Sequence, residues 1–181
     1  MIRLNNLTKK YSSVLAVDSI NLQVKQGEIF GFLGPNGAGK TTTIRMMAGL
    51  LKPTSGDAWI ENCNVYESPQ QAKQLCGFIP DRPFLYGKLT GREFLKFSGR
   101  LYSVDPQNTE NRTEQLFQLF NMSDYGDELI ESFSHGMKQR LVMASALIHK
   151  PKVIIVDEPM VGLDPKGAKL VKKIFRQLCQ N

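Results

Sequence analysis

A glycine-rich segment between residues 34 and 42 limits what this chain can fold into more than any other feature. Its spacing matches the phosphate-binding loop Gly-x-x-x-x-Gly-Lys-[Ser/Thr], which lies between a buried strand and a helix. The apolar run from Ile29 to Leu33 predicts that strand, and the run from Thr42 to Ala48 predicts the helix. The loop consists of Gly34, Pro35, Asn36, Gly37, Ala38, Gly39, Lys40, Thr41 and Thr42.

The residue types in this loop suit contact with a triphosphate. Glycines let backbone N–H groups turn toward an anion, with the positive end of the following helix dipole behind them. Lys40 can then neutralise the β and γ phosphates, and the hydroxyl of Thr41 can bind the Mg²⁺ that they carry. The alternative is a chance glycine turn before a helix, and the flanking strand and helix argue against it. We therefore expect a nucleotide-binding protein.

Composition and charge narrow the class of protein further. The 181 residues predict one domain with a sizeable core, without a signal peptide or a membrane-spanning run. Three scattered cysteines suit a reducing compartment. The net charge of +6 arises between residues 136 and 181, largely on one predicted helix. We favour a solvated helix face over a nucleic-acid surface for its cations, which are Lys166, Lys169, Lys172, Lys173 and Arg176.

The hydrophobic pattern predicts an α/β core with a helical insert. Residues 2–7, 20–24, 58–60 and 76–80 have the pattern of strands, and Ser68-Pro69 opens a short helix. Residues 91–102 and 109–120 then give two helices in succession, which breaks the strand–helix alternation. Tyr11 lies between the first two predicted strands. It is either an ordinary half-buried tyrosine or a ring that stacks on a purine.

Two further segments carry candidate chemistry. The apolar run from Val153 to Val156 predicts a strand buried on both faces, and it ends in Asp157 and Glu158. A carboxylate there can hold magnesium beside a phosphate loop, so we assign the metal to Asp157 and an attacking water to Glu158. Upstream, Ser134 and Gly136 open a predicted helix. They form either an anion site or a plain N-cap, and this stretch alone does not decide between the two.

Together these segments resemble the nucleotide-binding domain of ABC transporters over the whole chain. The loop matches the family's Walker A, and residues 133–137 lie at the position of its Leu-Ser-Gly-Gly-Gln signature. Asp157 and Glu158 match the Walker B aspartate and the catalytic glutamate. The segment Gly162-Leu163-Asp164 matches the D-loop, and Tyr11 falls where the family has its adenine-stacking aromatic residue. Residues 30–33 and 41–43 look most like the exporter-type branch.

The resemblance implies a P-loop NTPase fold with an ABC-ATPase core, N-terminal antiparallel β strands and a helical subdomain. The core would comprise residues 1–86 and 151–181, and the subdomain roughly residues 87–150. It also implies hydrolysis of Mg-ATP at the interface of a head-to-tail dimer, where Ser134, Gly136 and Asp164 face the partner's nucleotide. A separate transmembrane permease subunit would be driven from the cytoplasmic face of the cell membrane, without nucleic acid as a partner. The alternative function is an ATP-dependent clamp or regulatory module that moves no solute.

Three departures from the family pattern lead to further expectations. Asp81 stands where the family has a magnesium-facing glutamine, so we keep it as a metal candidate. His135 replaces the first glycine of the signature. The family's switch histidine follows one more strand, beyond the helix that starts near Lys166. We expect that final strand and histidine to be absent from this chain, and hydrolysis by the chain alone to be slow.

Overall fold

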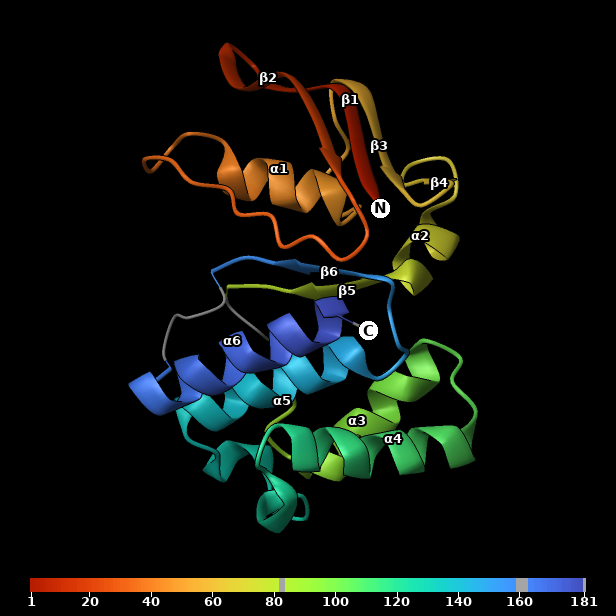
Figure 1. Cartoon of the computed structure of the whole chain (residues 1–181), viewed down its shortest axis with the longest axis vertical. Helices are drawn as coiled ribbons and strands as arrows, with labels where there is room; N and C mark the ends of the chain where they lie inside the picture. Colours follow the sequence, from red (N-terminus) through yellow and green to blue (C-terminus); the bar gives the residue numbers. More distant parts are fainter. Residues whose placement is uncertain (82–83, 159–162, 181) are drawn as a thin grey trace. The chain divides into compact units, whose positions relative to one another are not determined.

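The computed structural model describes residues 1–81, 84–158 and 163–180, which form two compact units (Figure 1). Unit 1 comprises Met1–Phe78, Lys152–Asp157 and Cys179–Asn181. Unit 2 comprises Ile79–Pro151 and Glu158–Leu178. Each unit therefore combines segments that are far apart in the sequence. The predicted boundaries of the helical subdomain at residues 87 and 150 stay a prediction.

Unit 1 contains a four-stranded antiparallel sheet in the order β2-β1-β3-β4. Its strands are β1 (Ile2–Tyr11), β2 (Val14–Val24), β3 (Ser55–Ile60) and β4 (Cys63–Asn64). Ile2, Leu4 and Leu7 are buried on one face, as the alternating pattern predicts. The prediction of N-terminal antiparallel strands is confirmed, but β1 and β2 are longer than expected. Tyr11 is the last residue of β1, opposite Val14, so its predicted place between the strands was wrong.

Helix α1 (Lys40–Met47) follows the glycine-rich loop and packs against β2 and β3 (Figure 1). Ile44, Met46 and Met47 join the core beneath the sheet. The short helix α2 (Pro69–Leu75) begins after Ser68 with proline at its start, as predicted. It leads into β5 (Cys76–Ile79), which pairs with β6 (Val153–Val156) in a second sheet. β6 is buried on one face and half-buried on the other, so it is less enclosed than we expected.

The predicted strand at residues 29–33 is wrong. This segment has no regular secondary structure, and the side chains of Ile29 and Leu33 are 62% and 96% exposed. A strand exists only where a neighbouring backbone completes its hydrogen bonds, and within the described residues no segment pairs with this one. Phe32 still packs against the core of unit 1. The segment is apolar in composition, but apolar composition alone produced neither a strand nor burial of the whole segment.

Unit 2 is helical. It contains α3 (Gly91–Leu101), α4 (Pro106–Leu119), α5 (His135–Leu147), most of α6 (Pro165–Gln180) and two short 3₁₀ turns, Ser123–Tyr125 and Ile130–Ser132. The two predicted successive helices are confirmed as α3 and α4, and both pack against α5. Thr90 begins α3 with a capping box that includes Glu93. Arg92 joins α3 to α4 through two hydrogen bonds to Glu114, of 2.8 and 3.0 Å.

Candidate nucleotide-binding site

The glycine-rich loop of unit 1 has a backbone that only glycine adopts without strain. Gly37 and Gly39 have φ angles of 82° and 83°, in the left-handed region. A Cβ atom at Gly39 would lie 2.4 Å from the carbonyl oxygen of Ala16 in β2. The absence of a side chain at Gly39 therefore lets the β1–β2 hairpin approach the loop. Ala38 donates its backbone N–H to the carbonyl of Pro35 at 3.3 Å, which closes the turn.

Lys40 is the first residue of α1 and folds back over the loop that precedes it. Its Nζ atom donates hydrogen bonds to the carbonyl oxygens of Gly34 and Pro35, both at 2.8 Å. Thr43 is buried, and both its backbone N–H and its hydroxyl donate to the carbonyl of Gly39 at 2.9 Å. Thr43 thus fixes the end of the loop, and Lys40 holds its ammonium group against the carbonyl groups of the loop. An anion in the loop would meet this ammonium group, free backbone N–H groups and the N-terminus of a helix.

The structure brings Thr41 and Asp157 together. The hydroxyl of Thr41 donates to Oδ1 of Asp157 at 3.4 Å, although the two residues are 116 positions apart. Asp157 is only 5% exposed, at the end of β6. A hydroxyl and a carboxylate beside a phosphate loop are the two protein ligands that hold Mg²⁺ in P-loop enzymes. These two residues fit the ion, whereas no cluster of three or more His, Cys, Asp or Glu in the described ranges could hold a metal.

Glu158 differs from its neighbour in both exposure and backbone. Its side chain is exposed, and its φ angle of 53° lies in the left-handed region, which is unfavourable for a residue with a side chain. Asp157 is buried, so the two adjacent carboxylates occupy different environments. The predicted division of labour between them is compatible with this difference and stays a prediction.

Tyr11 lies at the tip of the β1–β2 hairpin, and the residue is 46% exposed. Sequence reasoning missed the side chain beside it: Nζ of Lys9 lies 5.2 Å from the centroid of the Tyr11 ring. The signal was available, because residues two apart on a strand point to the same face. The β2 strand of this hairpin also carries Ala16, which contacts the loop at Gly39.

Sequence reasoning also missed Tyr66, which holds the far end of α1. Its hydroxyl donates to the carbonyl oxygens of Met46 at 2.6 Å and Leu51 at 3.4 Å. Burial, assisted by the negative charge of Asp57, raises the pKa of the Tyr66 hydroxyl above its ordinary value. The hydroxyl therefore keeps its proton, and its role as a donor, to higher pH than an exposed tyrosine would. No short motif marks such a residue, because its partners come from a helix end that precedes it by about twenty positions.

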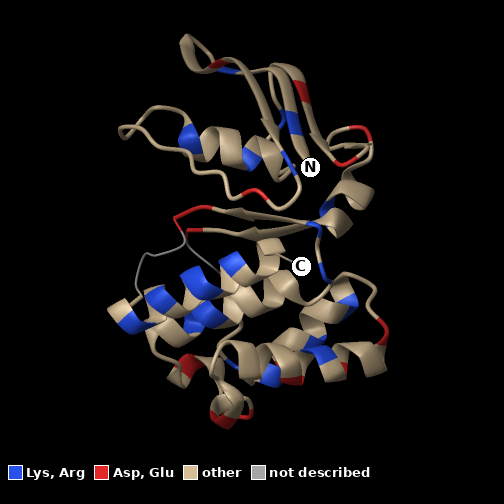
Figure 2. Cartoon of the chain, in the orientation of Figure 1, with Lys and Arg blue, Asp and Glu red and all other residues tan. Residues whose placement is uncertain are grey.

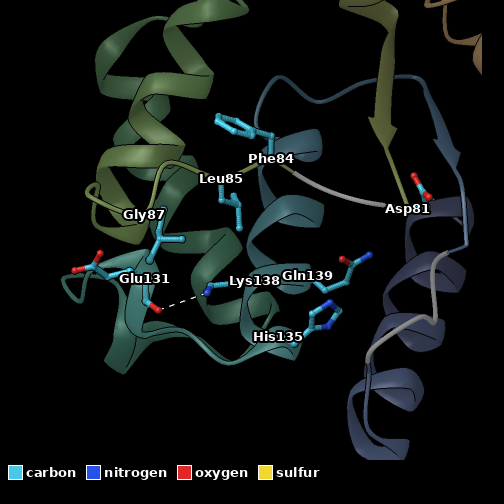
Figure 3. A pocket seen from close by; sticks show the side chains of 9 residues that line it. Asp81, Phe84, Leu85, Gly87, Glu131, His135, Lys138 and Gln139 are labelled. Carbon is cyan, nitrogen blue, oxygen red and sulfur yellow. Dashed lines mark hydrogen bonds between the residues drawn. The ribbon is translucent and has the colours of Figure 1, made fainter.

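In unit 2, Ser134 is the N-cap of α5, and its Oγ atom accepts a hydrogen bond from the backbone N–H of Met137 at 3.3 Å. The capping role is therefore confirmed, and an additional anion-binding role stays a prediction. Gly136 is in the first turn, where its carbonyl accepts from Nε of Arg140 at 3.3 Å. His135 lines a cavity of about 480 Å³ together with Asp81, Lys138 and Gln139 (Figure 3). Lys138 also donates to the carbonyl of Glu131 at 3.4 Å, the dashed line in Figure 3.

Asp164 precedes α6, and its Oδ1 atom accepts a hydrogen bond from the backbone N–H of Gly167 at 2.9 Å. This contact stabilises the start of the helix. Gly162, part of the predicted D-loop, lies outside the described residues. The basic residues of α6 form an exposed stripe (Figure 2), as expected for a solvated helix face. No helix in the described ranges is both long enough and apolar enough to cross a lipid bilayer.

Curated proteins with similar sequences are ATP-binding proteins of transport systems. The chain is 41% identical over 180 residues to the bacitracin transport ATP-binding protein BcrA of Bacillus licheniformis, covering 99% of this chain and 58% of that protein. It is 36% identical over 178 residues to the linearmycin resistance ATP-binding protein LnrL of Bacillus subtilis (strain 168), covering 98% of this chain and 57% of that protein. The chain thus spans less than two thirds of the length of these relatives.

Solved structures with the same fold lead to the same family. An ATP-binding subunit of an ABC transporter has a TM-score of 0.91 at 28% identity and covers 99% of this chain and 75% of its own. The dimeric structure of MJ0796, a bacterial ABC transporter cassette, has a TM-score of 0.89 at 25% identity, covering 99% and 83%. The sequence model of the ABC transporter family matches residues 17–161. The chain therefore belongs to the ABC transporter family.

Proposed function

We propose that this chain is the ATP-binding subunit, or the ATP-binding part, of an ABC transporter, and that it hydrolyses Mg-ATP to drive transport by a separate membrane subunit. One observation carries the proposal: the contact of Thr41 with Asp157 beside a loop closed over Lys40. A phosphate loop alone would bind many anions. A hydroxyl and a buried carboxylate beside it make the site suitable for a triphosphate with its magnesium ion.

The described residues of unit 1 suggest how the nucleotide would be held. The phosphates would accept hydrogen bonds from the backbone N–H groups of residues 34–42, and Lys40 would exchange its two carbonyl partners for the β and γ phosphates. Tyr11 would stack on the adenine through its exposed ring. Thr41 and Asp157 would hold Mg²⁺, which supplies charge neutralisation for the transferred phosphoryl group.

Hydrolysis needs a group that orients water, and Glu158 is our candidate. Its carboxylate is exposed and follows Asp157 directly in the chain. Asp81 belongs to unit 2 and lines the cavity that also contains His135. Among the residues that the structure describes, no contact supports a role for Asp81 on the metal, so that role rests on its sequence position alone.

The proposed partners are a second cassette and a membrane subunit, because in this family arrangement one cassette supplies only part of each nucleotide site. Ser134, Gly136 and Asp164 would contact nucleotide bound to a second cassette in a head-to-tail dimer, a homodimer or a heterodimer. The membrane subunit would be a separate permease, and the chain would work at the cytoplasmic face of the cell membrane. The names of the transport and resistance relatives support this assignment.

Lys40→Ala tests the nucleotide site. We expect this change to raise the dissociation constant of Mg-ATP by at least about tenfold, because a charged hydrogen-bond donor to the phosphates is lost. Arg45→Ala is the matched control, since it removes the same charge from an exposed position of the same helix. Titration with a fluorescent ATP analogue measures both. An unchanged dissociation constant for Lys40→Ala would mean that the nucleotide binds elsewhere.

Affinity purification from detergent-solubilised membranes tests the transport role. The full-length protein should co-purify with a multi-span membrane protein, and that complex should release phosphate from ATP in an Asp157-dependent manner. If the protein dimerises with ATP but no membrane subunit co-purifies, it is a clamp or a regulator and the transport role is refuted.

A further inference from the structure

The side chain of Lys9 connects the tip of the β1–β2 hairpin to the segment that follows α1. Its Nζ atom lies 5.2 Å from the ring centroid of Tyr11 and donates a hydrogen bond to the carbonyl of Lys52 at 2.7 Å. Both groups belong to unit 1. One ammonium group thus contacts the proposed adenine-stacking ring on one side and a fixed backbone carbonyl on the other.

The carbonyl of Lys52 is a well-held anchor. The preceding residues are tied to α1, because Leu50 and Leu51 donate their backbone N–H groups to the carbonyl of Arg45 at 2.9 and 3.2 Å. The following residues are tied to β1. The backbone N–H of Thr54 donates to the carbonyl of Thr8 at 2.8 Å, and the backbone N–H of Lys10 donates to Oγ1 of Thr54 at 3.0 Å. Hydrogen bonds therefore hold the backbone on both sides of Lys52, whose carbonyl accepts from Lys9.

The Tyr11 side chain lies in an exposed position. It is the last residue of its strand, and 46% of its surface is exposed. An exposed tyrosine at a hairpin tip samples several rotamers, and stacking on a base requires it to stop in one of them. A cation over one face lowers the energy of the rotamer that makes this contact. A base would then stack on the opposite face.

We propose that Lys9 is a positioning residue for adenine recognition. Its ammonium group, held by the carbonyl of Lys52, keeps the Tyr11 ring in one orientation, so that the nucleotide base stacks on a ring that is already in place. This inference rests on the proposed function, because it requires Tyr11 to stack on the base. It adds that Lys9 contributes to the affinity for the base and not to the affinity for the phosphates. The contribution comes from preorganisation of the ring.

Binding of ATP and of inorganic tripolyphosphate, both with Mg²⁺, separates base from phosphate recognition. Isothermal titration calorimetry on the full-length protein would compare wild type, Lys9→Met, Lys9→Arg and Tyr11→Ala. Lys9→Met should weaken ATP binding by roughly two- to fivefold, the range expected for loss of an exposed cation–π contact. The dissociation constant of tripolyphosphate should not change. Lys9→Arg should restore ATP binding, because arginine keeps the cation over the ring.

Lys10→Met is the matched control. It removes the same charge one residue away, from an exposed side chain on the other face of β1. It should leave the dissociation constants of both ligands unchanged. The double variant Lys9→Met/Tyr11→Ala should bind ATP as Tyr11→Ala does, since Lys9 has no ring to position there.

Distinct results would refute the two levels of the proposal. An equal loss of ATP and tripolyphosphate binding in Lys9→Met would overturn the positioning role, and so would a loss that persists in the Tyr11→Ala background. Unchanged ATP binding in Lys9→Met, with a loss in Tyr11→Ala, would also overturn it while leaving the stacking role of Tyr11 intact. If Tyr11→Ala itself leaves ATP binding unchanged, the base is not recognised at Tyr11 and both statements fail.

Discussion

Side chains of the same chemical type have different environments in this chain. Asp157 is buried beside the Thr41 hydroxyl, whereas Glu158 is exposed with a left-handed backbone. Cys76 is buried at the start of β5, whereas Cys63 and Cys179 are partly exposed. In both cases the local surroundings determine what chemistry the side chain can perform.

Separate changes of the two carboxylates should have different effects in the full-length protein. Glu158→Gln keeps the shape of the side chain but removes the carboxylate that would orient water, so ATP should bind and remain unhydrolysed. Asp157→Asn should instead raise the concentration of Mg²⁺ needed for half-maximal binding of ATP. Phosphate release and magnesium titrations measure these effects. The same behaviour in both variants would contradict the assigned roles.

The thiol of Cys76 should be inert in the native protein. Burial raises the pKa of this thiol from an ordinary value of 9.0 to about 12, against the smaller opposing effect of a hydrogen bond from the backbone N–H of Ile155. At pH 8, Ellman's reagent should therefore label Cys63 and Cys179 well before Cys76, and unfolding in guanidinium should expose the third thiol. Equal labelling rates for all three thiols in the native protein would contradict the burial of Cys76.

The same shift makes stability depend on pH. The folded state holds the Cys76 proton more tightly than the unfolded state, so this contribution to the free energy of unfolding is complete below pH 9. It is lost as the pH rises from 9 toward 12. Denaturation curves of wild type and Cys76→Ala over this range supply the control, because all other titrating groups are shared. The wild type should lose more stability than the variant.

At the scale of elements, the β1–β2 hairpin and the phosphate loop form one assembly. The carbonyl of Ala16 in β2 approaches Gly39 so closely that no side chain fits there. The next residue, Val17, is buried and belongs to the same core as Ile44 of α1. Because the hairpin also carries Tyr11, we expect displacement of the hairpin from the loop to change both the proposed base stacking and the proposed phosphate binding.

Gly39→Ala should therefore impair both binding and stability. The new Cβ would lie 2.4 Å from the carbonyl oxygen of Ala16, at a φ angle of 83° that alanine disfavours. We expect a loss of about 1–3 kcal/mol in the free energy of unfolding and weaker ATP binding. Gly31→Ala is the control, because its Cβ would meet no atom within 4 Å. Chemical denaturation that ranks Gly31→Ala as equally destabilised would contradict the close approach.

At the scale of the whole molecule, the two units carry different parts of the proposed site. The phosphate loop and Asp157 belong to unit 1, and Ser134, Gly136 and Asp164 belong to unit 2. In a head-to-tail dimer each nucleotide would contact the loop of one chain and the signature segment of the other. A chain with a defect in one segment could then be rescued by a chain with a defect in the other.

Mixing two inactive variants tests this arrangement. Lys40→Ala disables the loop, and Gly136→Asp places a carboxylate against the partner's phosphates at a helix start that tolerates negative charge. Neither variant alone should form an ATP-dependent dimer on size exclusion. Because neither variant should pair with itself, every dimer in an equal mixture should be mixed, with one of its two sites intact. The absence of any recovery in the mixture would contradict the head-to-tail arrangement.

The sequence alone predicted the parts of this protein whose cause is local. The glycines and Lys40 determine the loop, Ser134 opens α5, and Pro69 starts α2, because backbone conformation and helix starts depend on residues a few positions apart. The helical periodicity of residues 91–120 predicted α3 and α4 for the same reason. The family resemblance also followed from short motifs and their order.

The tertiary structure decided what depends on partners far away in the chain. The apolar run at residues 29–33 reads as a strand, yet it is irregular, because a strand needs a second backbone that no local pattern supplies. The contact of Thr41 with Asp157 and the contacts of Lys9 with Tyr11 and Lys52 depend on how β1, α1 and β6 pack. Local sequence sets the conformation of each segment, whereas these contacts exist only once burial of a shared core has brought the segments together.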